Sequence, residues 1–159
     1  MPHATTSPDV ALIARRLAAQ PDLWQPLVQF DEQTRFTLRL PGGPDHEVWL
    51  LTWLPGQGTA WHDHGGSAGA FATVQGTLTE RHAVPLTDGR ARPVPFARRL
   101  GDGRVRPFGP RHVHRVTNDD LVPAVSVHVY APSLREMTEY ERRGGLLYSS
   151  RTELAGVNW

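Results

Sequence analysis

Two histidines separated by a single residue, His62 and His64, constrain the fold of this chain more than any other feature. In an extended strand, successive side chains point to opposite faces, so both imidazoles share one face while Asp63 points away from it. Two imidazoles on one face can bind one metal ion. A second histidine source, His112 and His114, lies far enough along the chain to fall on another strand of a folded-over sheet. This spacing favours a metal site inside a small β-barrel.

Composition narrows the chemistry that is available. The 159 residues suffice for one domain with a buried core. The chain has no cysteine, which excludes disulfides, thiolate metal ligands and a cysteine nucleophile, so imidazole and carboxylate remain as the strong ligands. It also has no lysine, which excludes Schiff-base chemistry. With 17 basic and 16 acidic residues the formal net charge is +1, and nothing indicates nucleic acid or an anionic membrane as a partner.

No segment has the pattern of a targeting or membrane-spanning sequence. The N-terminal stretch lacks a basic region followed by an apolar run, and no later stretch approaches the length that crosses a bilayer. We therefore expect a cytoplasmic protein with no membrane partner, present as a monomer or weak oligomer.

The distribution of apolar residues predicts a mainly β fold with short N-terminal helices. Ser7, Pro8 and Asp9 have the order of a helix start with Ser7 as the N-cap, and a second short helix is expected at about 23–30. Short apolar runs separated by glycine and proline predict strands at 35–40, 47–54, 69–74, 76–84, 104–108, 112–117 and 124–130. Many short strands with little helix among them indicate a sandwich or barrel.

The other segments complete the expected domain. Residues 85–103 carry two Asp-Gly pairs and several arginines, which predict exposed hairpins with a solvated arginine face. Residues 133–142 are expected to form a helix, and Val157 and Trp159 to pack back on the barrel. We expect a single domain with a helical cover at 1–33, a barrel core at 34–132 and a C-terminal extension at 133–159.

Glycines frame both histidine groups. Gly56 and Gly58 precede the His-x-His pair and Gly76 follows it. Downstream, a Pro-x-Gly sequence at 107–109 is followed by His-x3-Asn at 114–118. These two groups of glycines and histidines, in this order along the chain, resemble the two motifs of the cupin superfamily. The fold of that superfamily is a double-stranded β-helix or jelly-roll barrel.

The residues leave the third metal ligand open between two histidines on one strand face. His112 fits a Pro-x-Gly-x2-His spacing, and His114 fits His-x3-Asn. Many cupins add a glutamate a few residues after the His-x-His pair, where this chain has Ala68 and Gly69. Three neutral imidazoles leave up to three positions open on an octahedral ion and favour an anionic ligand such as a thiolate. Such a site suits Fe(II), and zinc, nickel and copper stay compatible with these ligands.

A polar pattern marks a later strand. Ser126, His128 and Tyr130 alternate with two valines and so share one face. A half-exposed strand shows the same alternation. If this face instead lines the barrel, the three side chains form a hydrogen-bond relay that ends in a phenol able to donate to a bound substrate or oxygen.

Three motifs together resemble those of the cysteine dioxygenases, small cupin-type thiol dioxygenases, over about residues 35–132. They are His-Asp-His-Gly at 62–65, His-Arg-Val-x-Asn at 114–118 and Ser-x-His-x-Tyr-x-Pro at 126–132. The resemblance implies a fold, an activity and a set of site residues.

The resemblance implies an Fe(II) enzyme that takes L-cysteine and O2 to cysteine sulfinic acid, in cysteine catabolism. It implies three metal ligands, His62, His64 and His114. It implies an outer relay of Ser126, His128 and Tyr130, with Tyr130 also contacting the substrate. The Ala131-Pro132 bond is a candidate cis peptide. Gly69 stands where animal members carry a cysteine that is cross-linked to the relay tyrosine, so no thioether can form, as in bacterial members.

The family also uses an early arginine to hold the substrate carboxylate. Arg35 is the best match and Arg39 the competitor, and the alternative for either is an ordinary surface arginine. A planar guanidinium suits this task because it binds a carboxylate through two parallel hydrogen bonds.

Three other functions stay open. One is a dioxygenase for another small thiol, such as 3-mercaptopropionate, and another is a non-catalytic metal-binding cupin. The third is a zinc-dependent isomerase or hydrolase, which is disfavoured because no carboxylate base is evident beside the three imidazoles. Glu80 would supply one only if its strand turned it inward.

Overall fold

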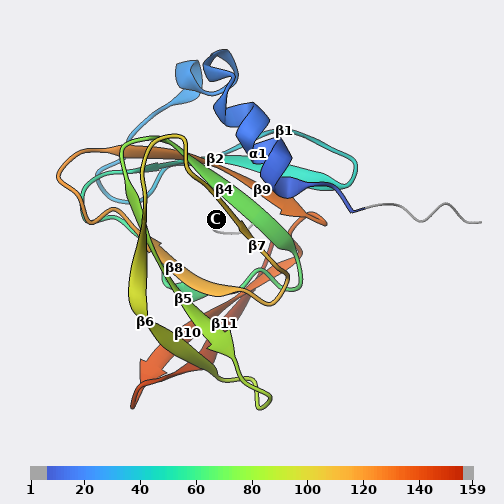
Figure 1. The fold of residues 1–159 in the computed structure, drawn as a ribbon, viewed down its shortest axis with the longest axis vertical. Coiled ribbons are helices and arrows are strands. Elements are labelled where there is room, and N and C mark those ends of the chain that lie inside the picture. Colours follow the sequence, from blue (N-terminus) through green and yellow to red (C-terminus); the bar gives the residue numbers. More distant parts are fainter. Residues whose placement is uncertain (1–6, 156–159) are drawn as a thin grey trace, which may run out of the picture.

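The fold is mainly β, as the sequence predicts, and consists of an open sheet packed with a closed barrel of strands (Figure 1). The computed structural model describes residues 7–155. Its helical elements are α1 (Val10–Ala18), η1 (Pro21–Leu23) and η2 (Gln25–Leu27). Its strands are β1 (Thr37–Gly43), β2 (His46–Trp53), β3 (Trp61–His62), β4 (Ala68–Gln75), β5 (Leu78–Pro85), β6 (Ala91–Leu100), β7 (Val105–Phe108), β8 (Val113–Thr117), β9 (Ala124–Ala131), β10 (Glu136–Arg143) and β11 (Leu146–Leu154).

The strand order places the two histidine segments side by side. The open sheet has the order β1-β2-β9-β4-β7, and the closed barrel has the order β10-β11-β6-β5-β8-β3. β3 and β8 pair antiparallel with His62 opposite His114, although 52 positions separate them in the sequence. β4 and β9 are neighbours in the other sheet.

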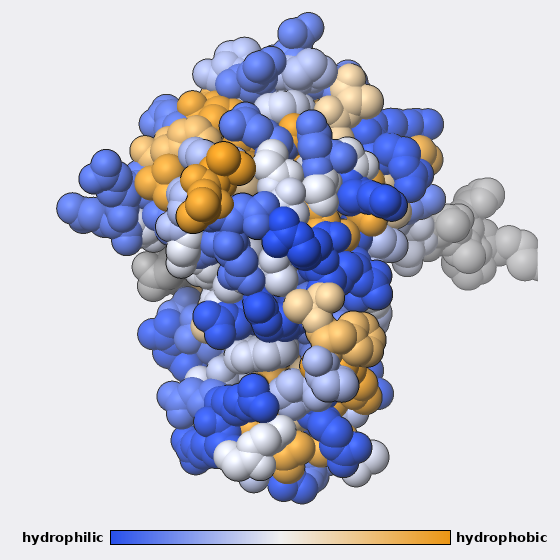
Figure 2. All heavy atoms as spheres, turned by 60° about the vertical axis from the view of Figure 1, so that its left-hand side comes forward, coloured by the Kyte–Doolittle hydropathy of each residue, from blue (hydrophilic) through white to orange (hydrophobic). Residues whose placement is uncertain are grey.

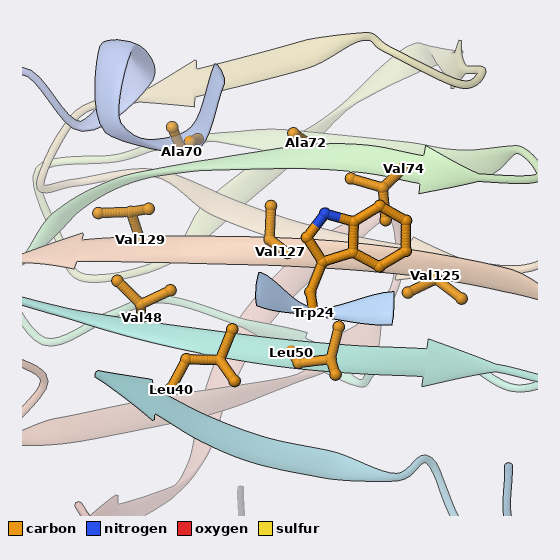
Figure 3. Packing of buried hydrophobic residues seen from close by; sticks show 11 residues of the cluster. Trp24, Leu40, Val48, Leu50, Ala70, Ala72, Val74, Val125, Val127 and Val129 are labelled. Atoms are coloured by element: carbon orange, nitrogen blue, oxygen red, sulfur yellow. The ribbon is translucent and has the colours of Figure 1, made fainter. Parts of the chain in front are cut away.

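The open sheet has an apolar core on its outer face, and its inner face packs against strands of the closed barrel. Its outer face is covered by α1 and Trp24, which pack on Val48 and Leu50 of β2 and on Val127 of β9 (Figures 1 and 3). Side chains alternate along a strand, so the residues between these valines and leucines face inward. The outer core thus fixes which side chains of β2 and β9 face the closed barrel.

The C-terminal segment forms a hairpin, and the helix expected at 133–142 is wrong. β10 pairs with β11 at each of its eight residues, through a turn at Gly144 and Gly145 with φ of 55° and 87°. β10 also pairs with β3, with Glu139 opposite His62. These strand hydrogen bonds outweigh the local helix propensity that suggested a helix.

The N-terminal predictions need two corrections. The N-cap is Asp9, not Ser7, because its side chain accepts a hydrogen bond from the backbone N–H of Leu12 at 3.0 Å. The helix expected at 23–30 is replaced by the two 3₁₀ turns, since Pro26 has no N–H to continue a helix. The expected packing of Val157 and Trp159 falls outside the described residues.

The predicted strands between 35 and 130 are confirmed, with ends that shift by up to three residues. The exposed segment at 85–103 includes β6, most of whose side chains are exposed, paired with β5. The Ala131-Pro132 peptide bond is cis, as expected. None of the helices in the described part of the chain is long and apolar enough to cross a membrane.

Among the described residues, the exposed large apolar side chains lie on several separate segments. The face drawn in Figure 2 is largely hydrophilic, with separate hydrophobic patches. Among the described residues the most exposed large hydrophobic side chains are Leu121, Leu154 and Phe96, on three different segments. Scattered exposed apolar side chains are normal for a folded protein.

Gly69 generates a prediction about stability. A Cβ at this position would lie 2.6 Å from Cζ of Phe108 and 2.9 Å from the carbonyl oxygen of Val129. The substitution Gly69→Ala is therefore expected to lower the free energy of unfolding by about 1–3 kcal/mol through overpacking, measured by urea unfolding. Gly109→Ala is the control, because its Cβ would meet no atom within 4 Å. Equal stability of the two variants would contradict the account.

Candidate functional site

Three histidine side chains meet between the open sheet and strands β3 and β8 of the closed barrel. His62 is in β3, His64 follows it by two residues, and His114 comes from β8. One ring nitrogen from each lies within 4.8 Å of the others, and the ring centroids are 4.7–4.9 Å apart. All three side chains are buried. The structure therefore brings together the three residues that the resemblance indicates as metal ligands.

Asp63 lies on the other side of the same segment, as strand alternation predicts. Its carboxylate accepts hydrogen bonds from the backbone N–H groups of Gly65 and Thr138 at 3.0 and 3.3 Å. It also accepts the O–H of Tyr140 at 2.8 Å. These bonds tie β10 to the segment that carries the two histidines.

Hydrogen bonds fix the ring nitrogens of two of the histidines. Nδ1 of His62 lies 2.9 Å from the carbonyl oxygen of Ala60, which can only accept, so this nitrogen carries the proton and Nε2 has the free lone pair. Nδ1 of His114 lies 2.9 Å from Oε1 of Glu80, and the same argument frees its Nε2. Both rings are thus held in the tautomer that can bind a metal through Nε2.

His64 supplies the test of whether a metal fits. The residue is 1% exposed, yet neither ring nitrogen has a hydrogen-bond partner within residues 7–155. Buried polar atoms without partners cost free energy, so such atoms call for an explanation such as an ion. A divalent metal bound by the three imidazoles would satisfy one of these nitrogens. The donor set therefore fits a metal ion.

The local electrostatics keep the imidazoles neutral. Burial, together with the neighbouring imidazoles, lowers the pKa of His62 and His64 well below the ordinary value. Burial also lowers the pKa of His114, against the opposing effect of the Glu80 carboxylate. Neutral imidazole is the form that binds metal, so these rings need not lose a proton first.

Glu80 is turned inward, which the sequence could not decide. Its Oε1 lies 2.7 Å from Nε2 of His112 and 2.9 Å from Nδ1 of His114, and its Oε2 lies 2.5 Å from Nε of Arg106. Burial alone would raise the pKa of Glu80, but hydrogen bonds from His112, His114 and Arg106 outweigh it and hold that pKa well below the usual range. Glu80 is thus an ionised partner of His114 and not a base free to act on a substrate.

His112 lies beside this carboxylate and outside the three-histidine cluster. One metal-ligating atom from each of Glu80, His112 and His114 also lies within 4.8 Å of the others, so these residues form a second candidate metal-binding group. Arg106 places a positive charge on the same carboxylate, which disfavours a cation there. The three-histidine cluster is the better metal site of the two.

The polar face of β9 points toward the three-histidine cluster. Oγ of Ser126 lies 2.8 Å from Nε2 of His128, and Nδ1 of His128 lies 3.4 Å from the hydroxyl of Tyr130. The sequence did not reveal a fourth member, Trp53, whose Nε1 donates to Ser126 at 2.9 Å. Its only signal is its position on the inward face of β2, opposite Ala124 of β9.

The direction of these hydrogen bonds follows from a count of donors. The indole of Trp53 can only donate, so Ser126 accepts from it and has its own O–H free for Nε2 of His128. His128 then carries its proton on Nδ1 and donates to the oxygen of Tyr130. This arrangement satisfies the donors of Trp53, Ser126 and His128, and it leaves the O–H of Tyr130 free to donate into the cavity that this residue lines.

The pKa values agree with this direction. Burial lowers the pKa of His128 to about 3, with additional repulsion from His114 and Arg35, so the ring stays neutral. Burial raises the pKa of Tyr130 above its usual range, and the phenol keeps its proton at neutral pH. Tyr130 is therefore a hydrogen-bond donor in this site.

A cavity of about 90 Å³ opens beside the histidines, lined by His62, His114, His128, Tyr130 and Arg35 among others. The guanidinium of Arg35 lies over the ring of Trp53, 4.9 Å from its centroid. Within residues 7–155 it has no carboxylate partner. Arg39, the competing candidate, is 61% exposed and forms an ion pair with Glu47 at 3.3 Å. Of the two arginines, Arg35 is the one that lines the cavity.

Phe108 is a further residue of the site that the motifs did not indicate. Its ring stacks on His64, with centroids 4.7 Å apart, and on His112 at 5.0 Å. It also fills the space above Gly69. Phe108 therefore holds the ring of His64, which lacks the hydrogen bonds that orient the other two histidines.

Comparison with known proteins identifies the family. Residues 4–143 match the family model of cysteine dioxygenase type I. The chain belongs to the cysteine dioxygenase type I family. It is 28% identical over 142 residues to cysteine dioxygenase type 1 of Homo sapiens, and equally to that of Pongo abelii, covering 86% of this chain and 70% of each relative. Family membership supports a metal-dependent oxidoreductase of the thiol dioxygenase type.

Solved structures support the cupin fold. The protein TT1209 from Thermus thermophilus has a TM-score of 0.58 and 20% identity, covering 69% of this chain and 93% of its own. A Klebsiella pneumoniae protein with a double-stranded β-helix domain has a TM-score of 0.57 and 19% identity, covering 68% and 80%. A cupin superfamily protein from Desulfitobacterium hafniense has a TM-score of 0.54 and 10% identity, covering 69% and 87%. The predicted cupin barrel is confirmed.

Glu80 generates a prediction about metal affinity. The substitution Glu80→Gln keeps the size of the side chain but removes the charge that orients His114, and losing such a partner typically costs about 10- to 100-fold in metal affinity. We expect a loss of that size for Co²⁺, measured by titration of the metal-free protein. Glu141→Gln is the matched control, since Glu141 is 60% exposed and pairs only with Arg143 among the described residues. Unchanged Co²⁺ affinity in a folded Glu80→Gln protein would contradict this role.

Proposed function

We propose that this protein is an iron-dependent thiol dioxygenase that oxidises L-cysteine with O2 to cysteine sulfinic acid. The observation that carries the proposal is one cavity, within the described part of the chain, lined by the unpaired guanidinium of Arg35, the phenol of Tyr130 and two imidazoles of the three-histidine cluster. The proposed metal ligands are His62, His64 and His114. Family membership supports the reaction type, and the cavity supports a small thiol acid as substrate.

Iron is proposed because the donor set consists of nitrogen ligands with open positions, which suits Fe(II). When bound by the three imidazoles, it would supply the positions for thiolate and dioxygen and the electron transfer between them. Both oxygen atoms end on the substrate sulfur, which supplies all the electrons, so no external reductant is needed. Three uncharged ligands leave the charge of the ion uncompensated and favour an anionic thiolate.

The side chains of the cavity bind and orient the substrate. Arg35 would bind the carboxylate through two parallel hydrogen bonds, with its guanidinium held against the ring of Trp53. Tyr130 would donate its O–H to the substrate or to oxygen, and His128 and Ser126 hold the phenol in place from behind. Leu134 and Met137 form an apolar part of the wall, which restricts water at the reacting atoms.

The proposal includes the expected cytoplasmic location and the monomeric or weakly oligomeric state, which rest on the sequence alone. It does not include zinc-dependent hydrolysis or isomerisation. The carboxylate that those reactions would use as a base, Glu80, is already held by His112, His114 and Arg106.

The test is oxygen consumption by protein loaded anaerobically with Fe(II), with L-cysteine and 3-mercaptopropionate offered separately and sulfinate quantified. We expect one sulfinate per O2 consumed from L-cysteine. Arg35→Gln should lower kcat/KM by about 10- to 100-fold, the size expected for losing charged hydrogen bonds. Arg39→Gln, the control outside the cavity, should stay near wild type.

Two outcomes of this experiment would contradict the proposal and support one of the alternative functions. A higher kcat/KM with 3-mercaptopropionate than with L-cysteine would make the protein a dioxygenase for an amine-free thiol. No oxygen uptake with either thiol would leave a non-catalytic metal-binding cupin.

A further inference from the structure

The C-terminal hairpin contributes charged side chains to the wall of the cavity. Glu139 of β10 and Glu153 of β11 both line it, together with Met137. In the register of the hairpin, Glu139 lies opposite Arg151, and Met137 lies opposite Glu153. Residues that lie opposite each other on neighbouring strands have side chains on the same face of the sheet, and so do residues two positions apart along one strand. The four side chains therefore project from one face, toward the cavity.

These charges do not cancel. Nη2 of Arg151 lies 3.2 Å from Oε2 of Glu139 and 2.9 Å from Oε1 of Glu153. One guanidinium between two carboxylates leaves a net charge of −1. We call Glu139, Arg151 and Glu153 the acidic rim. Glu139 and Glu153 line the cavity, whereas Arg151 is not among its lining residues and has a side chain that is 60% exposed.

The hairpin itself does not require this arrangement. β10 and β11 pair along all eight residues of β10, and exposed ion pairs contribute little to stability. Among the described residues that line the cavity, Glu139 and Glu153 are the acidic ones and Arg35 is the arginine. The cavity is therefore bipolar, with a cation on one wall and an anionic rim on another.

We propose that the acidic rim is a charge filter that favours thiols carrying an ammonium group over thiol acids that lack one. The inference rests on the proposed function and names a determinant of its substrate class. At neutral pH L-cysteine is a zwitterion with no net charge, whereas 3-mercaptopropionate is an anion. The rim repels the anion on its way to Arg35 and attracts the ammonium group of the zwitterion.

The expected size of the effect follows from Coulomb's law. One unit charge about 7 Å from another, at an effective dielectric constant of about 40–80, between that of a protein surface and that of bulk water, changes a rate or binding constant by about two- to tenfold. At about 1 M salt, where the Debye length is about 3 Å, most of this effect is screened. The filter therefore tunes the preference between substrates and does not create it alone.

The test is a series of charge variants. The ratio of kcat/KM for L-cysteine to that for 3-mercaptopropionate is measured at low and at high ionic strength. Glu139→Gln and Glu153→Gln each remove a negative charge and should lower the ratio by about two- to tenfold. Arg151→Gln removes the positive charge and should raise it. Glu141→Gln, on the same strand but not lining the cavity, is the control and should leave the ratio unchanged.

A charge filter predicts that the ratio falls in Glu139→Gln and rises in Arg151→Gln, whereas a purely structural role does not predict opposite changes. Glu139→Gln and Arg151→Gln break the same ion pair, so a structural effect would shift the ratio in the same direction in both. That result would overturn the proposal, as would a wild-type ratio that does not depend on salt.

A binding measurement keeps this inference separate from the proposed activity. Trp49 and Trp53 line the cavity, so anaerobic binding of each thiol to the Fe(II)-loaded protein can be followed by tryptophan fluorescence. If neither thiol is oxidised, the proposed function fails, and the charge filter is judged on these affinities. The charge filter is supported if the ratio of the affinities for L-cysteine and 3-mercaptopropionate falls in the two glutamate variants and rises in Arg151→Gln. It is contradicted if this ratio is the same in all variants.

Discussion

Three imidazoles are buried at one point, and much of the surrounding structure serves to keep them neutral, oriented and close together. Each ring is held by a different means. A backbone carbonyl orients His62, the ionised Glu80 orients His114, and the ring of Phe108 stacks on His64. Without an ion, the unpaired nitrogens of His64 are a cost that the fold must bear. The geometry of the metal centre thus depends on side chains that lie outside the three-histidine cluster.

The two faces of the open sheet connect this centre to the stability of the protein. On β9, Val125, Val127 and Val129 pack under α1 (Figure 3), and the alternate residues face the three-histidine cluster. Burial of the valines therefore fixes the register that aligns Ser126, His128 and Tyr130. A shift of one residue would exchange the two sets, exposing the apolar core and removing the phenol from the site.

The sequence predicted the parts of the site that follow from local alternation. The shared face of His62 and His64 and that of the β9 triad are properties of any extended strand, and short motifs marked both. The position of Arg35 was left open because its strand follows a loop whose path no local rule gives. Glu80 was undecided because its orientation depends on the pairing of β5 with β8. The place of Trp53 in the relay depends likewise on the pairing of β2 with β9.

The C-terminal region was mispredicted for a related reason. Residues 136–143 are polar and lack a clear period, and their strand conformation arises from pairing with β11 and with β3. The acidic rim could not be foreseen, since it depends on this hairpin reaching the histidine segment.

The most direct test of the account is to locate a bound ion. Crystals of the protein loaded anaerobically with one equivalent of Fe(II) would be examined by anomalous scattering at the iron edge. The account predicts one ion, bound by nitrogens of His62, His64 and His114, with Glu80 outside its coordination sphere. An ion bound by Glu80, His112 and His114, with His62 and His64 unligated, would contradict it.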